Sequence, residues 1–222
     1  MPPRANAAFV AAMEDVLDVY TRPRDPQRPL VCFDESNKEQ HREVVEPLPV
    51  AAGQPVRYES PYQRNGVSNL FMCFAPLENW RHVKVTNQRT AIDWAQCMQE
   101  LVDVHFPAAE RIVVVQDNLN THTPAALSAA FEPAEAKRIW DRLEFHYTPK
   151  HGSWLNMAEI ELSVLSRQCL NRRIPDQEAL RYETTAWMER RNMARATIEW
   201  QFTTADARVK LTKLYPVLKP AD

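Results

Sequence analysis

Residues 111–117 read Arg-Ile-Val-Val-Val-Gln-Asp, so four apolar residues run directly into a polar one and then an acid. Continuous β-branched runs of this kind are typical of strands buried on both faces, which favours a sheet with helices on each side. The run brings Asp117 to the carboxyl end of the predicted strand. Ligand sites in such sheets gather at that edge, so Asp117 is a candidate site residue.

A second apolar run, Leu30-Val-Cys-Phe33, leads directly into Asp34 and Glu35. This pattern predicts a strand that ends at Phe33 and presents its first acid at the carboxyl end. One Asp after a strand is more often a turn or cap residue. Two such strands, with a dense polar stretch from Gln116 to His122 after the second, indicate that Asp34 and Asp117 share one site.

The remaining chain alternates between strand and helix patterns. Further strands are predicted at 67–74, 80–86 and 143–147, and helices at 6–20, 90–105, 124–131, 133–141, from 153 or 156 to 171, and 176–192. Residues 44–66 are rich in Pro and polar residues and predict a loop or irregular hairpin arm. This order predicts an α/β fold in which a mixed five-stranded sheet is flanked by helices. We expect three parts: a leading helix and linker (1–29), the main domain (30–195), and a tail that packs on or extends it (196–222).

Composition points to a globular chain without a membrane span. Apolar residues make up 45% of the 222, and the longest apolar runs fall far short of the roughly 20 residues that cross a bilayer. The N-terminus shows no signal peptide, so the expected location is the cytoplasm. Four widely spaced cysteines predict buried free thiols, and they are Cys32, Cys73, Cys97 and Cys169.

The net charge of −2 gives no support to a nucleic-acid partner. Its distribution is uneven, because residues 162–222 hold 11 Lys or Arg against 7 Asp or Glu, a net +4, and residues 1–161 hold 16 against 22, a net −6. A positive C-terminal third suits a DNA-binding face, and a solvated helix face explains the same residues equally well.

Clustered acids from separate elements suit metal-dependent phosphodiester chemistry. Two divalent ions about 3.5 to 4 Å apart activate a nucleophile and stabilise the leaving oxygen, and carboxylates hold them. Magnesium prefers oxygen ligands and keeps several waters, so three carboxylates suffice. Asp34 and Asp117 supply two, and a helix residue is expected to supply the third.

Three motifs make the chain recognisable: Phe33-Asp-Glu-Ser36, Gln116-Asp-Asn-Leu-Asn-Thr-His122 and Tyr147-Thr-Pro-Lys-His-Gly-Ser-Trp-Leu-Asn-Met-Ala-Glu159. In this order they resemble the DDE transposases of the insertion-sequence 630 and mariner superfamily. The resemblance spans residues 30–172 and extends more weakly to 216. It implies a ribonuclease H-like fold, and Asp34, Asp117 and Glu159 as catalytic residues that bind two Mg²⁺ or Mn²⁺ ions.

Glu161 is the competitor for the third acid. Residues two apart on a helix point about 200° away from each other, so Glu159 and Glu161 cannot serve one site equally. The family spacing of Leu-Asn-x-x-Glu favours Glu159, and it leaves Glu161 as a solvent-facing or salt-bridged residue.

Seven further residues are candidates for an outer shell around the acids or for DNA contact. They are Glu35, Asn118, Asn120, His122, Lys150, His151 and Trp154. A solvent-facing turn residue is the alternative for Glu35, turn chemistry is the alternative for both Asn residues, and His122 alternatively caps the helix that starts near Pro124. Lys150, His151 and Trp154 precede the third acid, where cations and a base-stacking ring would contact DNA. Trp154 is alternatively a core anchor.

The resemblance implies metal-dependent DNA cleavage and strand transfer, with element ends and target DNA as partners and a homodimer as a plausible active form. Relatives usually carry helix-turn-helix domains before the catalytic part, and about 30 residues precede the first strand here. We therefore expect end recognition to be absent or supplied by another chain. The implied location is the bacterial cytoplasm, at the nucleoid. Alternatives are a ribonuclease H-like nuclease that only hydrolyses, and a retired transposase domain acting as a DNA-binding module.

Overall fold

A computed structural model describes residues 6–44 and 62–216 of the chain. The strands are β1 (Leu30–Glu43), β2 (Tyr62–Ala75), β3 (Trp80–Thr86), β4 (Ile112–Gln116) and β5 (Leu143–Tyr147). The α-helices are α1 (Ala7–Tyr20), α2 (Ala91–Glu100), α3 (Pro124–Ala130), α4 (Pro133–Asp141), α5 (Met157–Leu165), α6 (Gln177–Met193) and α7 (Thr204–Lys210). Shorter turns include η3 (Ser153–Leu155) and the two π turns η2 (Leu101–His105) and η4 (Ser166–Leu170).

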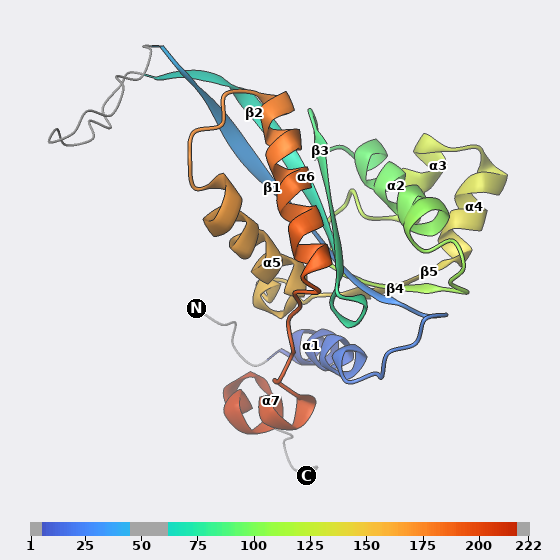
Figure 1. Ribbon diagram of the computed structural model, residues 1–222. Coiled ribbons are helices and arrows are strands. Elements are labelled where there is room, and N and C mark those ends of the chain that lie inside the picture. The colour runs from blue at the N-terminus through green and yellow to red at the C-terminus, as the bar shows by residue number, and fades with distance from the viewer. Residues whose placement is uncertain (1–5, 45–61, 217–222) are drawn as a thin grey trace, which may run out of the picture.

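The five strands form one mixed sheet in the order β3-β2-β1-β4-β5 (Figure 1). β1 pairs in parallel with β4, and β4 with β5, whereas β1, β2 and β3 are antiparallel neighbours. The last parallel pair between β1 and β4 joins Cys32 to Val115. The prediction of a mixed five-stranded sheet flanked by helices is confirmed.

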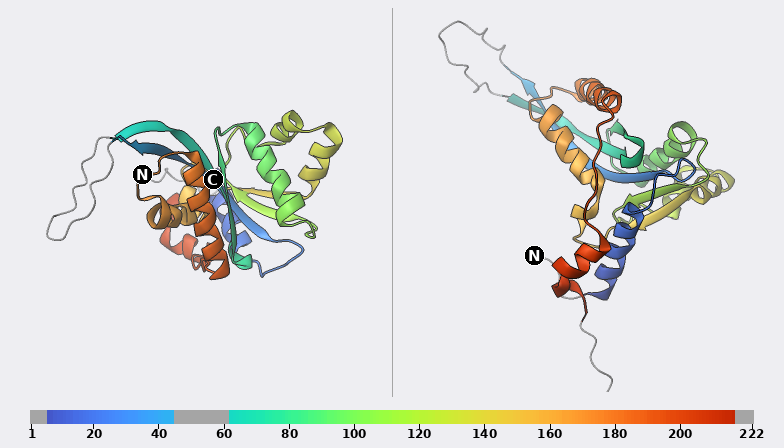
Figure 2. Two further views of the ribbon diagram at one scale, coloured as in Figure 1. Left: turned by 45° about the horizontal axis from the view of Figure 1, so that its top comes forward. Right: turned by 60° about the horizontal axis from the view of Figure 1, so that its bottom comes forward.

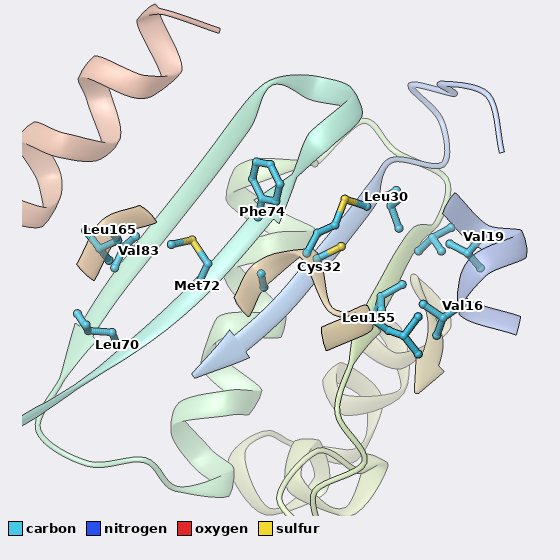
Figure 3. Close-up of a cluster of buried hydrophobic side chains, with 14 of the residues drawn as sticks. Val16, Val19, Leu30, Cys32, Leu70, Met72, Phe74, Val83, Leu155 and Leu165 are labelled. Atoms are coloured by element: carbon cyan, nitrogen blue, oxygen red, sulfur yellow. The ribbon is translucent and has the colours of Figure 1, made fainter. Parts of the chain in front are cut away.

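Two hydrophobic layers cover the sheet. Because side chains alternate along a strand, Cys32 faces a core built with α1, α5 and α6, and its neighbours Val31 and Phe33 face the core under α2, α3 and α4. Figure 1 shows α5 and α6 on one side of the sheet and α2 to α4 on the other. In Figure 3, alternate residues of β2 (Leu70, Met72, Phe74) point into the first core.

The leading helix and the tail pack beneath this first core. Buried side chains of α1 and Ala207 of α7 belong to the same cluster as the β1 and α5 residues. The backbone N–H of Asn6 donates to the carbonyl of Leu214 at 3.1 Å, and Arg208 pairs with Glu14 at 2.8 Å. Figure 2 shows α1 and α7 side by side. The domain boundaries at residues 29/30 and 195/196 stay predictions.

The predicted end of the first strand at Phe33 is wrong. β1 continues to Glu43, and Asp34 pairs with Met72 in the ribbon that β1 and β2 form beyond the parallel part of the sheet. Residues 62–66, predicted as loop, belong to β2, and the rest of the loop prediction, 45–61, lies outside the described residues. Gly66 has φ +98° where the register slips opposite Gln40, a conformation that favours glycine in a bulge.

The other predicted elements lie close to their expected positions. Two predicted helices end in π turns, so the patterns that ran to His105 and Asn171 continue as η2 and η4. All four cysteines are free and buried, as predicted. Among the described residues no helix has both the length and the apolarity to cross a membrane.

Candidate active site

Asp34 and Asp117 occupy equivalent positions on neighbouring parallel strands. Each lies two residues beyond the last β1–β4 pair, Cys32 and Val115. Side chains two residues apart share a face of a strand, so Asp34 lies on the face that Cys32 presents to the α5 side, whereas Asp117 directly follows the end of β4. Asp34 is nevertheless inside β1, because β1 runs on past the end of β4.

Glu159 comes to the same place in the first turn of α5. Asn156 caps this helix, since its Oδ1 accepts from the backbone N–H of Ala158 at 3.1 Å. The amide nitrogen of Asn156 donates to the carbonyl of Phe33 at 2.9 Å and to Oδ2 of Asp34 at 3.3 Å. The cap residue therefore fastens the start of α5 to β1 and orients Asp34 directly.

The electrostatics of Asp34 reflect this crowding. Burial, which is the largest influence, and the negative charges of Glu159, Asp117 and Glu35 together raise the pKa of Asp34 from 3.8 to about 7. The backbone N–H of Glu35, which donates to Oδ1 of Asp34 at 2.7 Å, opposes the shift. Like charges near a carboxyl group disfavour its ionised form, so added positive charge would favour the ionised form of Asp34.

His122 links Asp117 to Glu35. Its Nδ1 lies 2.9 Å from Oδ1 of Asp117 and its Nε2 lies 2.8 Å from Oε1 of Glu35. Burial of the ring opposes protonation, but the hydrogen bonds to Asp117 and Glu35 outweigh it and raise the pKa of His122 to about 9. The alternative roles for His122 as a helix cap and for Glu35 as a solvent-facing turn residue are wrong, because both side chains are almost fully buried in this contact.

Glu161 faces away from these acids. Its carboxylate is fully buried and lies 2.8 Å from Nε of Arg81 and 2.8 Å from Nε of Arg191. Arg81 belongs to β3 and Arg191 to α6, so Glu161 ties α5 to the sheet edge and to the next helix. Of the two sequence alternatives, it is salt-bridged rather than solvent-facing.

The comparisons with known proteins agree with this geometry. Residues 29–181, more than half of the chain, match the family described as DDE superfamily endonuclease. The chain belongs to this family. The predicted family membership and the prediction of an endonuclease-type enzyme are confirmed. No curated protein matches the sequence.

Solved structures of the Mos1 mariner transposase share the fold of this DDE family member. The chain matches the "Mos1 mariner paired end complex with Mn" with a TM-score of 0.57 and 15% identity, covering 88% of this chain and 60% of that one. The chain matches the "Mos1 Strand Transfer Complex" with a TM-score of 0.55 and 14% identity, covering 85% of this chain and 56% of that one. The chain thus spans about 60% of the length of the first of these relatives. The likeness confirms the predicted ribonuclease H-like architecture.

The loop before α5 in this DDE endonuclease is built around a tight turn. The N–H of Gly152 donates to the carbonyl of Pro149 at 2.7 Å, and His151 between them has φ +67°, in the left-handed region. A Cβ on Gly152 would lie 2.6 Å from Cγ of Pro149, so the turn needs glycine there. Lys150 and His151 are exposed at this turn.

Trp154 is a surface residue of this loop. It is 44% exposed and packs edge-on against Phe202 of the tail with ring centroids 5.9 Å apart. The core-anchor alternative for Trp154 is therefore wrong. Asn118 and Asn120 are exposed after β4, and in the described part of the chain neither makes a hydrogen bond to the acids.

Asn156 is a site residue that the sequence analysis missed, since its position predicted only one of two possible starts of a helix. Its contact with Asp34 joins residues 122 positions apart. The signal was its place in the Leu-Asn-x-x-Glu spacing. Tyr20 of α1 supports the same turn, because its hydroxyl donates to the carbonyl of Leu155 at 2.7 Å.

Proposed function

We propose that this chain is the catalytic domain of a DNA transposase, which cleaves DNA strands and transfers the cut ends to a target. What supports the proposal is that Asp34 and Asp117 each lie two residues beyond the last parallel β1–β4 pair, and that Asn156, three residues before Glu159, hydrogen-bonds to Asp34. The family match to DDE endonucleases supports the same chemistry. The catalytic assignment of the three acids is part of the proposal.

The donor set fits divalent metal ions. Three carboxylates from separate elements offer the oxygen ligands that Mg²⁺ and Mn²⁺ prefer. Asp34, Asp117 and Glu159 would hold two such ions. When bound, they would supply a nucleophile at neutral pH and neutralise charge on the leaving oxygen.

The chain's own residues hold these ligands in place. Asn156 fixes one oxygen of Asp34. His122, protonated at neutral pH because its pKa is about 9, holds one oxygen of Asp117 and anchors Glu35. A cation bound to one carboxylate oxygen leaves the other oxygen directed for metal binding. Glu35 and His122 therefore act as positioning residues.

The surface around the acids suits DNA. Lys150 and His151 lie exposed on the turn that leads to Glu159, and the exposed ring of Trp154 lies beyond them. Cationic side chains bind phosphates without reading sequence, and aromatic rings stack on unpaired bases. These three residues are proposed to hold the strand that is cut.

The relatives suggest what assembles with the chain. The matched Mos1 structures are paired-end and strand-transfer complexes, with Mn in one and Mg in another. By this similarity we propose element-end and target DNA as substrates and a pair of chains as the active form. An enzyme with this substrate would work at the bacterial nucleoid, in the cytoplasm.

A strand-transfer assay tests the proposal. Purified protein is incubated with Mn²⁺, a fluorescent DNA duplex ending in a 3′-hydroxyl, and supercoiled plasmid, and joined products are resolved on a gel. A transposase should form fluorescent joined plasmid. The Asp117→Asn variant should lose this product, and the surface control Asp141→Asn should keep it. Plasmid that is nicked without joining would instead indicate a nuclease, and DNA binding without nicking would indicate a DNA-binding module.

A further inference from the structure

A second cluster of metal-ligating side chains lies at the β3 edge of the sheet. It consists of His82 in β3, Glu100 at the end of α2 and His105 at the end of the π turn η2. One ligand atom from each residue lies within 4.8 Å of the other two. All three line a groove of about 500 Å³ that includes none of the three proposed catalytic acids.

The π turn is what brings His105 into the cluster. It widens the last turn after α2, from Leu101 to His105, and the His105 ring lies 4.5 Å from the His82 ring between centroids. Trp80 packs against His105 at 4.8 Å and forms an apolar wall beside both imidazoles. Such π turns are rare and occur frequently at functional sites.

We propose that His82, Glu100 and His105 form a zinc site that fastens the edge strand β3 to the end of α2. Two imidazoles and one carboxylate are a ligand set that Zn²⁺ favours, whereas Mg²⁺ takes oxygen ligands. Zinc bonds of about 2.0–2.2 Å require the three ligand atoms to draw together by roughly an ångström, which rotation of these half-buried side chains allows. The groove admits a water as the fourth ligand.

The surroundings of the cluster agree with this assignment. Burial lowers the pKa of His82, and burial followed by the neighbouring His82 lowers the pKa of His105 to about 4. Both rings are therefore neutral at pH 7, the form in which imidazole binds metal. Lys84 holds Oε1 of Glu100 at 2.8 Å, which leaves the second carboxylate oxygen for the ion. Arg181 also lines the groove, and its charge and that of Lys84 oppose cation binding.

Zinc titration of the untagged, chelator-treated protein tests the site, with isothermal calorimetry for affinity and thermal melting for stability. We expect one Zn²⁺ per chain at this site and a rise in Tm on its addition. His82→Asn and His105→Gln should each weaken binding by about 100-fold or more, since even the loss of an outer hydrogen-bond partner costs about 10- to 100-fold. Lys84→Gln should tighten binding, because it frees Glu100.

Matched variants separate this site from the catalytic acids. His146→Asn removes a histidine bound by Asp15 and Glu144 elsewhere and should leave zinc affinity unchanged. The double variant Asp34→Asn, Glu159→Gln should also retain the zinc-dependent rise in Tm. Zinc affinity that survives His82→Asn and His105→Gln made in the double acid variant, or a zinc-dependent rise in Tm that disappears in the double acid variant itself, would overturn the proposal. The outcome is independent of whether the chain cleaves DNA.

Discussion

Replacing Asp34 by Asn is expected to stabilise the metal-free protein as pH rises. The folded state raises the pKa of Asp34 from 3.8 to about 7, chiefly through burial and then through the neighbouring carboxylates. The folded protein thus binds this proton more tightly than the unfolded chain. The resulting stability is present below pH 3.8 and is lost as pH rises through about 7.

The magnitude follows from the pKa difference. One pKa unit corresponds to about 1.4 kcal/mol, so ionising Asp34 above pH 7 costs the folded state roughly 4 kcal/mol. Asn is isosteric with the neutral acid and avoids this cost. The free energy of unfolding of Asp34→Asn minus that of the wild type should therefore be small at pH 4 and reach roughly 3–4 kcal/mol at pH 8.

Urea denaturation in excess chelator at pH 4, 6 and 8 measures this difference. The control Asp141→Asn removes an exposed carboxylate that pairs with Lys137, and exposed pairs contribute about 0–1 kcal/mol, so its difference from wild type should stay small at every pH. A stability difference for Asp34→Asn that does not grow with pH, or an Asn variant less stable than wild type at pH 8, would refute the raised pKa of Asp34 in the folded protein.

Three other substitutions test the framework of the site. Glu161→Gln leaves two arginine charges without their buried partner and should lower the free energy of unfolding by about 3–5 kcal/mol, measured by urea denaturation. Gly152→Ala places a methyl group 2.6 Å from Pro149, which should displace the turn and reduce nicking while circular dichroism stays unchanged. Asn156→Ala removes a helix cap and should cost about 1 kcal/mol, and by freeing Asp34 it should slow nicking about 10- to 100-fold.

Each of these has a contrary result. A Glu161→Gln variant as stable as wild type would mean that the buried pairs are not formed. Full nicking by Gly152→Ala would show that the turn before α5 does not position Glu159. Asn156→Ala that loses stability but nicks at the wild-type rate would reduce Asn156 to a helix cap.

The equivalence of Asp34 and Asp117 was predictable because it depends on local pattern. Each acid follows an apolar run, and parallel strands place their carboxyl ends together. The continuation of β1 was not predictable in this way, since Asp34 and the residues after it are polar and lack the alternation of a half-buried strand. Their pairing with β2 depends on backbone hydrogen bonds to residues about 20 to 40 positions later.

Contacts between distant segments account for the other differences. The helical period places Glu159 and Glu161 on different faces, but it does not show that Glu161 meets Arg81, which lies in another element. Likewise, Glu35 and His122 were separate candidates, and only the sheet topology places them 2.8 Å apart. Residue patterns report the period of an element, whereas side-chain partners depend on how elements pack.

Nicking of supercoiled plasmid in Mn²⁺ tests the central claim most directly. Asp34→Asn, Asp117→Asn and Glu159→Gln are compared with the exposed α6 control Glu189→Gln, with the urea midpoint of each protein measured in parallel. If the three acids form one metal-dependent site, the first three variants should lose nicking without losing stability, and the control should nick at the wild-type rate. Retained nicking in any one of the three, in a folded protein, would contradict the assignment.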